Sequence, residues 1–514
     1  MEELDPAKLE VMKHAFTAIP EQMGAALQRS AYSPNIKERK DESCALFTKE
    51  SQMIAQAEHI PVHLGAMPSA LKEAVSSCEM KEGDQLILND PYAGGTHLPD
   101  ITLIKPIFRE GDLIGYVVNR AHHSDIGGKT PGSMPGDSKV LKEEGIVISP
   151  RHIMRGGSYE DEVVTLLKQA RSPEERMGDI RAQIGANQRG AEELKKTVDR
   201  FGMEVFQAFQ KQVLDYSEKR TREMIKDIPS GVYSYKDLME WGDGVELNFE
   251  VRIADEKVTF DFSGTDPQVE GNINAPEPVT LSAVYYVVRC LMPEDIPVNN
   301  GCYRPLSIQI PEKSVLNPEP PAAVSAGNVE TSQRVVELLL RALYEAFPEK
   351  IPAESQGTMN NLTIGSEGFT YYETIGGGAG ASASGNGESG VHVHMTNTKN
   401  TPIEAIENDY PLRVTAYKLR ERSGGEGEHK GGEGIVREIR LLKNAKVSIQ
   451  SERRKNAPRG INGGGDAKTG RNLRIKGKKE QEIGSKTTLQ MEKGESIRIE
   501  TPGGGGWGLE KDLS

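Results

Sequence analysis

The spacing of apolar residues changes near residue 230, and this change restricts the chain to folds that combine helices with sheets. Between residues 158 and 227, charged and apolar residues recur at the spacing of a helix. From Tyr233 to Gly264, polar and apolar residues alternate one by one, which is the pattern of half-buried antiparallel strands. The chain therefore contains at least two regions of different secondary structure.

The length of the chain indicates several domains. Its 514 residues exceed what a single core usually supports, so we expect about two to four domains. The pattern predicts a multidomain α+β protein with mixed helices, antiparallel sheets and a β-rich C-terminal part. An amphipathic helix over residues 7–31 opens the first domain, and a proline- and glycine-containing turn near residue 230 closes it. The predicted domains cover residues 1–230, 231–345 and 346–514.

Charge and composition argue against a nucleic-acid partner, a disulfide or zinc-ribbon scaffold and a membrane protein. The net charge is −13 and the isoelectric point is near 5.5, which argues against binding to nucleic acid. The four cysteines have neither the spacing of a zinc ribbon nor the density of a disulfide scaffold. The N-terminus does not read as a signal peptide, and no stretch approaches the ~18 apolar residues of a spanning helix. We expect a cytoplasmic protein with no membrane partner.

Two short stretches concentrate histidine and aspartate in a chain that has only 10 histidines: His97 and Asp100 in the first, and His122, His123 and Asp125 in the second. Imidazole and carboxylate together suit zinc, manganese or iron, and neighbouring glycines and a proline place the first pair on a tight loop. Either stretch alone is better explained as a capped turn or a surface ion pair. Because both occur, with strand-like apolar runs beside them, metal binding is the favoured interpretation.

Other candidate residues precede these stretches. Asp41 lies just before an apolar run, so it could begin a strand and face the same pocket. His59 and His63 are four residues apart, but Pro61 between them disfavours the regular helix on which such a pair would bind zinc. One of the two histidines could line a pocket while the other makes a buried hydrogen bond, and the sequence does not decide which.

Two features of the C-terminal half could suggest binding sites. The glycine-rich run at residues 376–381 has neither a phosphate-loop lysine nor the glycine spacing of a dinucleotide fold, so a flexible loop is the simplest interpretation. The chain is therefore not expected to bind ATP itself. His392 and His394 would point to one face if their segment is a strand, which suits either a second pocket, a subunit contact or an ordinary strand.

Several motifs carry a resemblance to a known family over nearly the whole chain. The most specific stretches are Glu38-Arg-Lys-Asp41, Gln56-Ala-Glu-His59-Ile-Pro-Val-His63-Leu-Gly, Asn89-Asp-Pro through Asp100, Ala121-His-His-Ser-Asp-Ile-Gly-Gly128, Gly327-Asn-Val-Glu-Thr-Ser-Gln333, Asn397-Thr-Lys-Asn-Thr-Pro-Ile-Glu404 and the closing Thr501-Pro-Gly-Gly-Gly-Gly-Trp-Gly. The sequence resembles the hydantoinase B family. This family includes the second subunit of ATP-dependent hydantoinases and lactamases, the C-terminal half of 5-oxoprolinase, and the large subunit of acetone and acetophenone carboxylases.

The resemblance implies a division of labour between two subunits. A hydantoinase A-like partner of actin-like ATPase fold would bind ATP and phosphorylate the substrate, and this chain would complete the reaction at a divalent metal, zinc or manganese. The resemblance assigns Asp41, His97, Asp100 and His122 as metal ligands, and it implies that the neighbouring His123 and Asp125 support the ligands or transfer protons. His59, as a possible pocket histidine, is the third catalytic candidate. Glu42 departs from the family pattern, in which an aromatic residue commonly follows the aspartate.

The expected function is ring opening of a small cyclic amide, such as a hydantoin, 5-oxoproline or another lactam, within a hetero-oligomer. One alternative is the large subunit of an ATP-dependent acetone- or acetophenone-type carboxylase. Another is a scaffold without catalytic activity that stabilises the ATPase partner.

Overall fold

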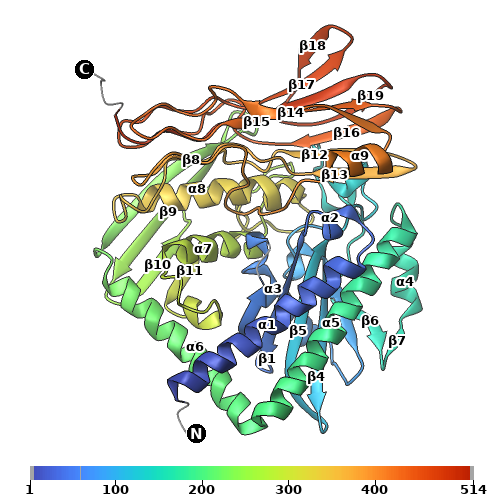
Figure 1. The fold of residues 1–514 in the computed structure, drawn as a ribbon, viewed down its shortest axis with the longest axis vertical. Helices are drawn as coiled ribbons and strands as arrows, with labels where there is room; N and C mark the ends of the chain where they lie inside the picture. The colour runs from blue at the N-terminus through green and yellow to red at the C-terminus, as the bar shows by residue number, and fades with distance from the viewer. Residues whose placement is uncertain (1–4, 58–59, 510–514) are drawn as a thin grey trace.

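The chain folds into helices and several sheets that pack in layers (Figure 1). The computed structural model, which describes residues 5–57 and 60–509, is 31% helical and 28% strand. The α-helices are α1 (Pro6–Ser30), α2 (Pro34–Lys37), α3 (Ala66–Ser77), α4 (Asp161–Leu167), α5 (Pro173–Phe201), α6 (Met203–Lys226), α7 (Glu277–Leu291), α8 (Ser332–Leu343) and α9 (Ile403–Asp409). Shorter helical turns are η1 (Pro61–His63), η2 (Pro91–Ala93), η3 (Pro131–Ser133), η4 (Leu141–Glu143), η5 (Asn300–Tyr303) and η6 (Gly327–Thr331).

A seven-stranded antiparallel sheet forms the centre of the N-terminal part, in the order β2-β1-β5-β4-β3-β6-β7. Its strands are β1 (Glu42–Thr48), β2 (Met53–Ala57), β3 (Gln85–Leu88), β4 (Asp100–Arg109), β5 (Asp112–His122), β6 (Arg151–Arg155) and β7 (Ser158–Tyr159). Helices α1, α5 and α6 cover part of one face, where Phe16 of α1 stacks between Phe206 and Phe209 of α6 at 5.1 and 4.8 Å. Most residues of β1, β4 and β5 are buried on both faces, which explains the continuous apolar runs of these strands.

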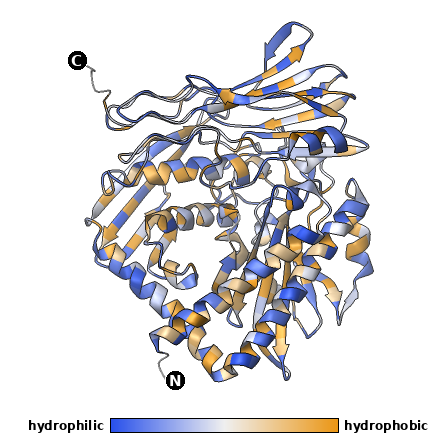
Figure 2. Cartoon of the chain, viewed as in Figure 1, coloured by the Kyte–Doolittle hydropathy of each residue, from blue (hydrophilic) through white to orange (hydrophobic). Residues whose placement is uncertain are grey.

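The middle part is a four-stranded sheet in the order β11-β10-β9-β8, in which only β10 and β11 run parallel. Its strands are β8 (Gly231–Met239), β9 (Val245–Ala254), β10 (Lys257–Asp261) and β11 (Leu306–Gln309). Hydrophobic and polar residues alternate along these strands (Figure 2), and the apolar side packs on α7 and α8. The same apolar core continues to the second face of the N-terminal sheet.

Two antiparallel sheets make up most of the C-terminal part, in the orders β13-β12-β16-β19 and β14-β15-β20-β17-β18, with one apolar core between them. The strands are β12 (Asn361–Ser366), β13 (Phe369–Glu373), β14 (Leu412–Arg420), β15 (Gly434–Leu441), β16 (Ala445–Gln450), β17 (Arg471–Lys476), β18 (Lys479–Glu482), β19 (Lys486–Met491) and β20 (Ser496–Glu500). Figure 1 shows this layer lying across one end of the other two parts.

Glycine-rich segments beside these sheets form a closely packed bundle, composed of residues 376–390, 423–434, 456–470 and 502–508. Backbone hydrogen bonds join the segments, including Gly504 N to Gly432 O at 2.9 Å and Gly432 N to Ala379 O at 2.9 Å. A Cβ atom on Gly431 would lie 1.8 Å from the oxygen of Gly504, so the glycines are needed for this close approach. The expectation of a flexible loop at residues 376–381 is therefore wrong.

The fold confirms the α+β prediction. The helix expected over residues 7–31 is α1, and the alternating region after residue 230 forms β8, β9 and β10. The segment with His392 and His394 is not a strand, and His394 has a left-handed backbone with φ of 56°. The predicted domain boundaries stay predictions. Within the described residues, no helix has both the length and the apolar composition needed to cross a membrane.

Candidate metal centre

The loop from residue 89 to residue 100 is shaped by its own polar side chains and glycines. Asp90 accepts a hydrogen bond from the backbone of Tyr92 at 3.0 Å and so begins η2. Gly94 follows with φ of +84°, and a Cβ there would lie 2.5 Å from the backbone nitrogen of Ala70. The Asn89 amide then donates to the carbonyl of Leu98 at 2.8 Å, which closes the loop. This local geometry brings the chain back to the start of β4.

Strand pairing brings the two histidine and aspartate stretches together. Asp100, the first residue of β4, is the direct partner of His122 at the end of β5, so both side chains lie on the same face of the sheet. Asp41 directly precedes β1, and its carbonyl accepts a hydrogen bond from the backbone of His122 at 3.0 Å. The expectation that Asp41 lies at the start of a strand is confirmed.

Three side-chain atoms converge at this point. Nε2 of His97 and Nδ1 of His122 each lie 3.1 Å from Oδ1 of Asp100, and the two nitrogens are 3.2 Å apart. All three side chains are at most 4% exposed. Asp41 lines the same small cavity without joining this close group.

The spacing of these three atoms fits binding of a divalent metal better than it fits a hydrogen-bonded cluster without a metal. Ligands about 2.1 Å from an ion and about 90–110° apart lie about 3.0–3.4 Å from one another, which matches the three distances. Without an ion, both imidazoles could donate to the carboxylate oxygen, but their two nitrogens would then face each other as donors. Nδ1 of His97 and Nε2 of His122 are buried with no hydrogen-bond partner among the described residues. Zinc or manganese suits this set of imidazole and carboxylate ligands.

Electrostatics favour the forms of Asp100 and His122 that could bind a metal. Burial alone would raise the pKa of Asp100, but His97, His122 and His63 outweigh it and hold that pKa well below its usual value. Burial lowers the pKa of His122, against the opposing effect of Asp100. An ionised carboxylate and a neutral imidazole are the states in which these side chains bind metals.

His63 is a further residue of the cavity. Its Nε2 lies 3.6 Å from Oδ2 of Asp100, and its Nδ1 is 2.9 Å from the Ser43 hydroxyl. The Thr96 hydroxyl donates to Oδ2 of Asp100 at 2.5 Å, so both oxygens of this carboxylate have fixed neighbours. The pairing of histidines at residues 59 and 63 was the signal for this residue in the sequence. Residue 59 lies outside the described residues.

The C-terminal part covers the cavity. Tyr372 of β13 stacks on the imidazole of His122 with ring centroids 4.7 Å apart, and the guanidinium carbon of Arg39 lies 4.7 Å from the centroid of the Tyr372 ring. The Tyr372 hydroxyl donates to the Asn361 amide at 2.8 Å. No feature of the sequence indicates Tyr372. Asn328 also lines the cavity, and it belongs to one of the stretches on which the family resemblance depends, residues 327–333.

The other two predicted catalytic residues make different contacts. His123 is buried on the opposite face of the sheet, where its Nε2 bonds the side chain of Gln183 at 2.9 Å, and burial lowers its pKa to about 4. Asp125 binds the backbone of Gly127 and Gly132, each at 2.7 Å, and pairs with Arg171 at 3.0 Å. The structure thus brings together His97, Asp100 and His122 around one point, whereas the catalytic roles of His123 and Asp125 stay predictions.

Comparison with known proteins places these observations in a family. Residues 5–510 match the family hydantoinase B/oxoprolinase. The chain is 43% identical to an uncharacterised protein of Methanocaldococcus jannaschii, over 99% of this chain and 92% of the archaeal protein. It is 44% identical to 5-oxoprolinase 1 of Arabidopsis thaliana over 98% of its own length, and it spans only 42% of the plant protein.

Two solved structures share the fold. The crystal structure of the ATP-dependent caprolactamase from Pseudomonas jessenii has a TM-score of 0.91 and 27% identity, with 99% of this chain and 92% of that chain covered. The nucleotide-free acetone carboxylase has a TM-score of 0.89 and 19% identity, with coverage of 98% and 76%, so this likeness shows the fold alone. From the family match along nearly its entire length, the chain belongs to the hydantoinase B/oxoprolinase family.

Proposed function

We propose that this chain is the metal-bearing subunit of an ATP-dependent hydrolase that opens small cyclic amides. The ring is activated beforehand by phosphorylation in a hydantoinase A-like ATPase subunit. The names of the related 5-oxoprolinase and of the ATP-dependent caprolactamase support both the ring amide and the requirement for ATP. The sequence has no phosphate-binding glycine motif, which supports the assignment of ATP to the partner.

The observation that carries the proposal is the convergence of His97, Asp100 and His122 in one buried cavity. A divalent ion held by these residues, with Asp41 beside it, would polarise a substrate oxygen and make water a stronger nucleophile at neutral pH. A ring amide resists attack by water because of its resonance, so activation of the carbonyl oxygen must come first. Water then adds to the activated carbon, and the carbon–nitrogen bond breaks with its electron pair and a proton going to nitrogen. Hydrolysis of the resulting acyl phosphate releases phosphate.

The side chains around Asp100 have separate tasks in this reaction. Thr96 and His63 fix the second carboxylate oxygen, so that Oδ1 stays directed at His97 and His122. His63, oriented by the Ser43 hydroxyl, is the side chain that we assign to pass a proton to the ring nitrogen. The C-terminal cover limits access of bulk water to the cavity.

The test is purification of the tagged chain from its own host, followed by native mass spectrometry for bound metal and co-purifying protein. We expect a divalent metal and an ATPase subunit, and we expect the complex to open a cyclic amide with release of ADP and phosphate. His97→Ala should lose both metal and ring opening. His152→Ala is the matched control, because this buried histidine also lies beside an aspartate, Asp84 at 3.4 Å, but outside the cavity. Metal binding or full turnover in His97→Ala would contradict the proposal.

The same complex separates the alternatives. A carboxylase subunit would require bicarbonate and would place labelled carbon in the product, whereas the hydrolase gives ring-opened product without either. A scaffold without catalytic activity would keep full turnover in His97→Ala and His122→Ala.

A further inference from the structure

The metal cavity is closed. Its free volume is about 20 Å³, which is enough for one water molecule, because a buried water needs about 10–15 Å³. Cavities that hold small organic ligands measure about 300–1000 Å³. A cyclic amide that has been activated at its oxygen can therefore enter only if part of the cavity wall moves.

The wall on the C-terminal side is better suited to move than the wall that carries the candidate ligands. Asp100 and His122 lie in paired strands, and the backbone of Asp41 is bonded to that of His122. Three residues of the segment 395–400, which we call the cover segment, line the cavity as well. The cover segment contains neither a helix nor a strand. Because irregular segments open at a lower free energy than paired strands, it is the part of the wall that we expect to open.

Arg39 binds the cover segment from the N-terminal part. It is 0% exposed, and its Nη2 donates to the hydroxyls of Thr374 at 3.0 Å and Thr398 at 3.4 Å. These two hydroxyls are 2.7 Å apart, and both threonines line the metal cavity. The backbone oxygen of Arg39 also accepts a hydrogen bond from the backbone of Lys399 at 3.0 Å. One residue thus contacts the cover segment through both its side chain and its backbone.

Other contacts fix the guanidinium of Arg39 in this position. Its Nη1 donates to the side-chain oxygen of Asn35 at 3.2 Å and to the carbonyl of Tyr372 at 3.3 Å. Its Nη2 lies 3.8 Å from Oδ2 of Asp41, which is too long for a hydrogen bond. The direct hydrogen bonds therefore favour a role at the cover segment over support of this candidate ligand. A planar guanidinium can bind all these acceptors at once, whereas the ammonium of a lysine cannot.

We propose that Arg39 is a positioning residue that holds the cover segment closed over the metal cavity. Loss of its hydrogen bonds to Thr398 and Lys399 opens the cavity to the activated ring. Their return excludes bulk water before the carbon–nitrogen bond breaks. This inference rests on the proposed function and adds a residue that controls access to the metal. Arg39 itself does not contact the reacting atoms.

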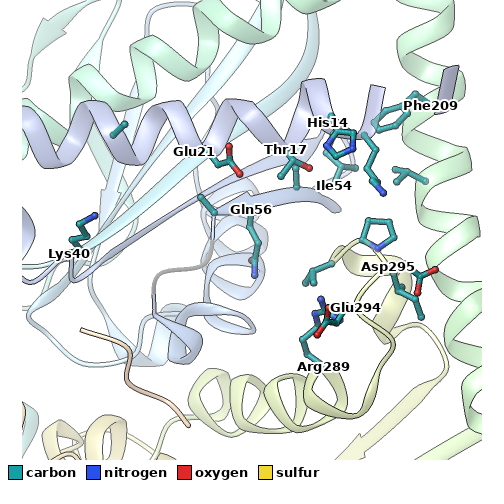
Figure 3. Close-up of a pocket in the computed structure, with 18 of the residues that line it drawn as sticks. His14, Thr17, Glu21, Lys40, Ile54, Gln56, Phe209, Arg289, Glu294 and Asp295 are labelled. Atoms are coloured by element: carbon teal, nitrogen blue, oxygen red, sulfur yellow. The ribbon is translucent and has the colours of Figure 1, made fainter. Parts of the chain in front are cut away.

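The test measures how fast metal enters and leaves the cavity. Uptake of Zn²⁺ by the metal-free chain and its release to excess EDTA are followed by stopped flow with a fluorescent zinc indicator. Arg39→Lys keeps the positive charge but loses the planar guanidinium, so both rates should rise about tenfold or more while the Kd stays within about twofold of the wild-type value. Thr398→Val removes the hydroxyl that Arg39 binds and should act in the same direction with Arg39 in place. Lys40→Arg is the matched control and should keep wild-type rates, because the side chain of Lys40 lines a separate cavity beside α1 (Figure 3).

Hydrogen–deuterium exchange of the metal-free chain is the second readout, and the backbone amides of residues 395–400 should exchange about tenfold faster in Arg39→Lys than in the wild type. Unchanged metal and amide exchange in Arg39→Lys and Thr398→Val would overturn this role of Arg39 and leave the proposed function intact. Faster release with unchanged uptake would also overturn it, because Arg39 would then stabilise the bound metal and not the closed segment. A wild-type chain that binds neither Zn²⁺ nor Mn²⁺ would overturn the proposed function, whereas amide exchange would still decide whether Arg39 closes the cover segment.

Discussion

Substitution of Gly504 by alanine should destabilise the glycine bundle strongly. The backbone of Gly504 is not in the left-handed region, so an alanine could adopt its conformation and only space is at issue. The added Cβ would lie 1.9 Å from the oxygen of Ala379, whereas real Cβ atoms essentially never approach closer than 3.0 Å. One segment must therefore move by about 1 Å, which is too far for the hydrogen bonds of this position to survive.

The magnitude follows from those contacts. Gly504 N donates to Gly432 O, and Gly504 O accepts from Gly425 N, each at 2.9 Å. Loss of two hydrogen bonds costs about 1–3 kcal/mol, and overpacking costs about 1–3 kcal/mol more. We expect Gly504→Ala to lower the free energy of unfolding by about 2–6 kcal/mol.

Trp507 is a suitable probe because it lies in the same bundle, where it pairs with His429. The chain has two tryptophans, so a Trp241→Phe background leaves Trp507 as the single fluorophore in urea unfolding. Gly484→Ala is the matched control, since its nearest neighbour would be 3.8 Å from the new Cβ, and its effect should stay within about 0.5 kcal/mol. Equal urea midpoints for the two alanine variants would refute the steric argument.

Three further predictions concern buried side chains. Arg437→Met should destabilise the chain by about 3–5 kcal/mol in urea unfolding, because it leaves the fully buried carboxylate of Glu373 unpaired, and an unchanged midpoint would contradict this. Burial raises the pKa of Glu330 to about 8, so between about pH 5 and pH 8 the folded chain keeps a proton that the unfolded chain has lost. The free energy of unfolding should therefore fall as pH rises from about 5 to about 8. Glu330→Gln should make this dependence on pH less steep in urea unfolding. Tyr372→Leu should weaken metal binding about tenfold by removing the ring stacked on His122, whereas Tyr372→Phe should bind metal as the wild type does; equal affinities in a metal titration would argue against this role.

Much of the fold followed from periodicity, because each element depends on residues close in sequence. The helical spacing before residue 31 and the alternation after Tyr233 predicted α1 and the strands of the middle sheet. The glycine-rich run was misinterpreted, because glycine alone cannot distinguish a mobile loop from segments that pack too closely for a Cβ. That distinction depends on neighbours such as Gly431 and Gly504, which lie far apart in the chain.

The candidate site also has a part that the sequence predicted and a part that depends on distant segments of the chain. The sequence by itself determined the chemistry of the candidate metal centre, since two imidazoles and a carboxylate within 26 residues offer the ligands that zinc or manganese prefers. Only the tertiary structure decided which other side chains surround that centre. Arg39 and Tyr372 meet across 333 residues of chain, and His63 rather than His123 faces the carboxylate of Asp100. Strand parity fixes the face on which each side chain lies, and packing of distant segments fixes its neighbours, so neither could be determined from local spacing alone.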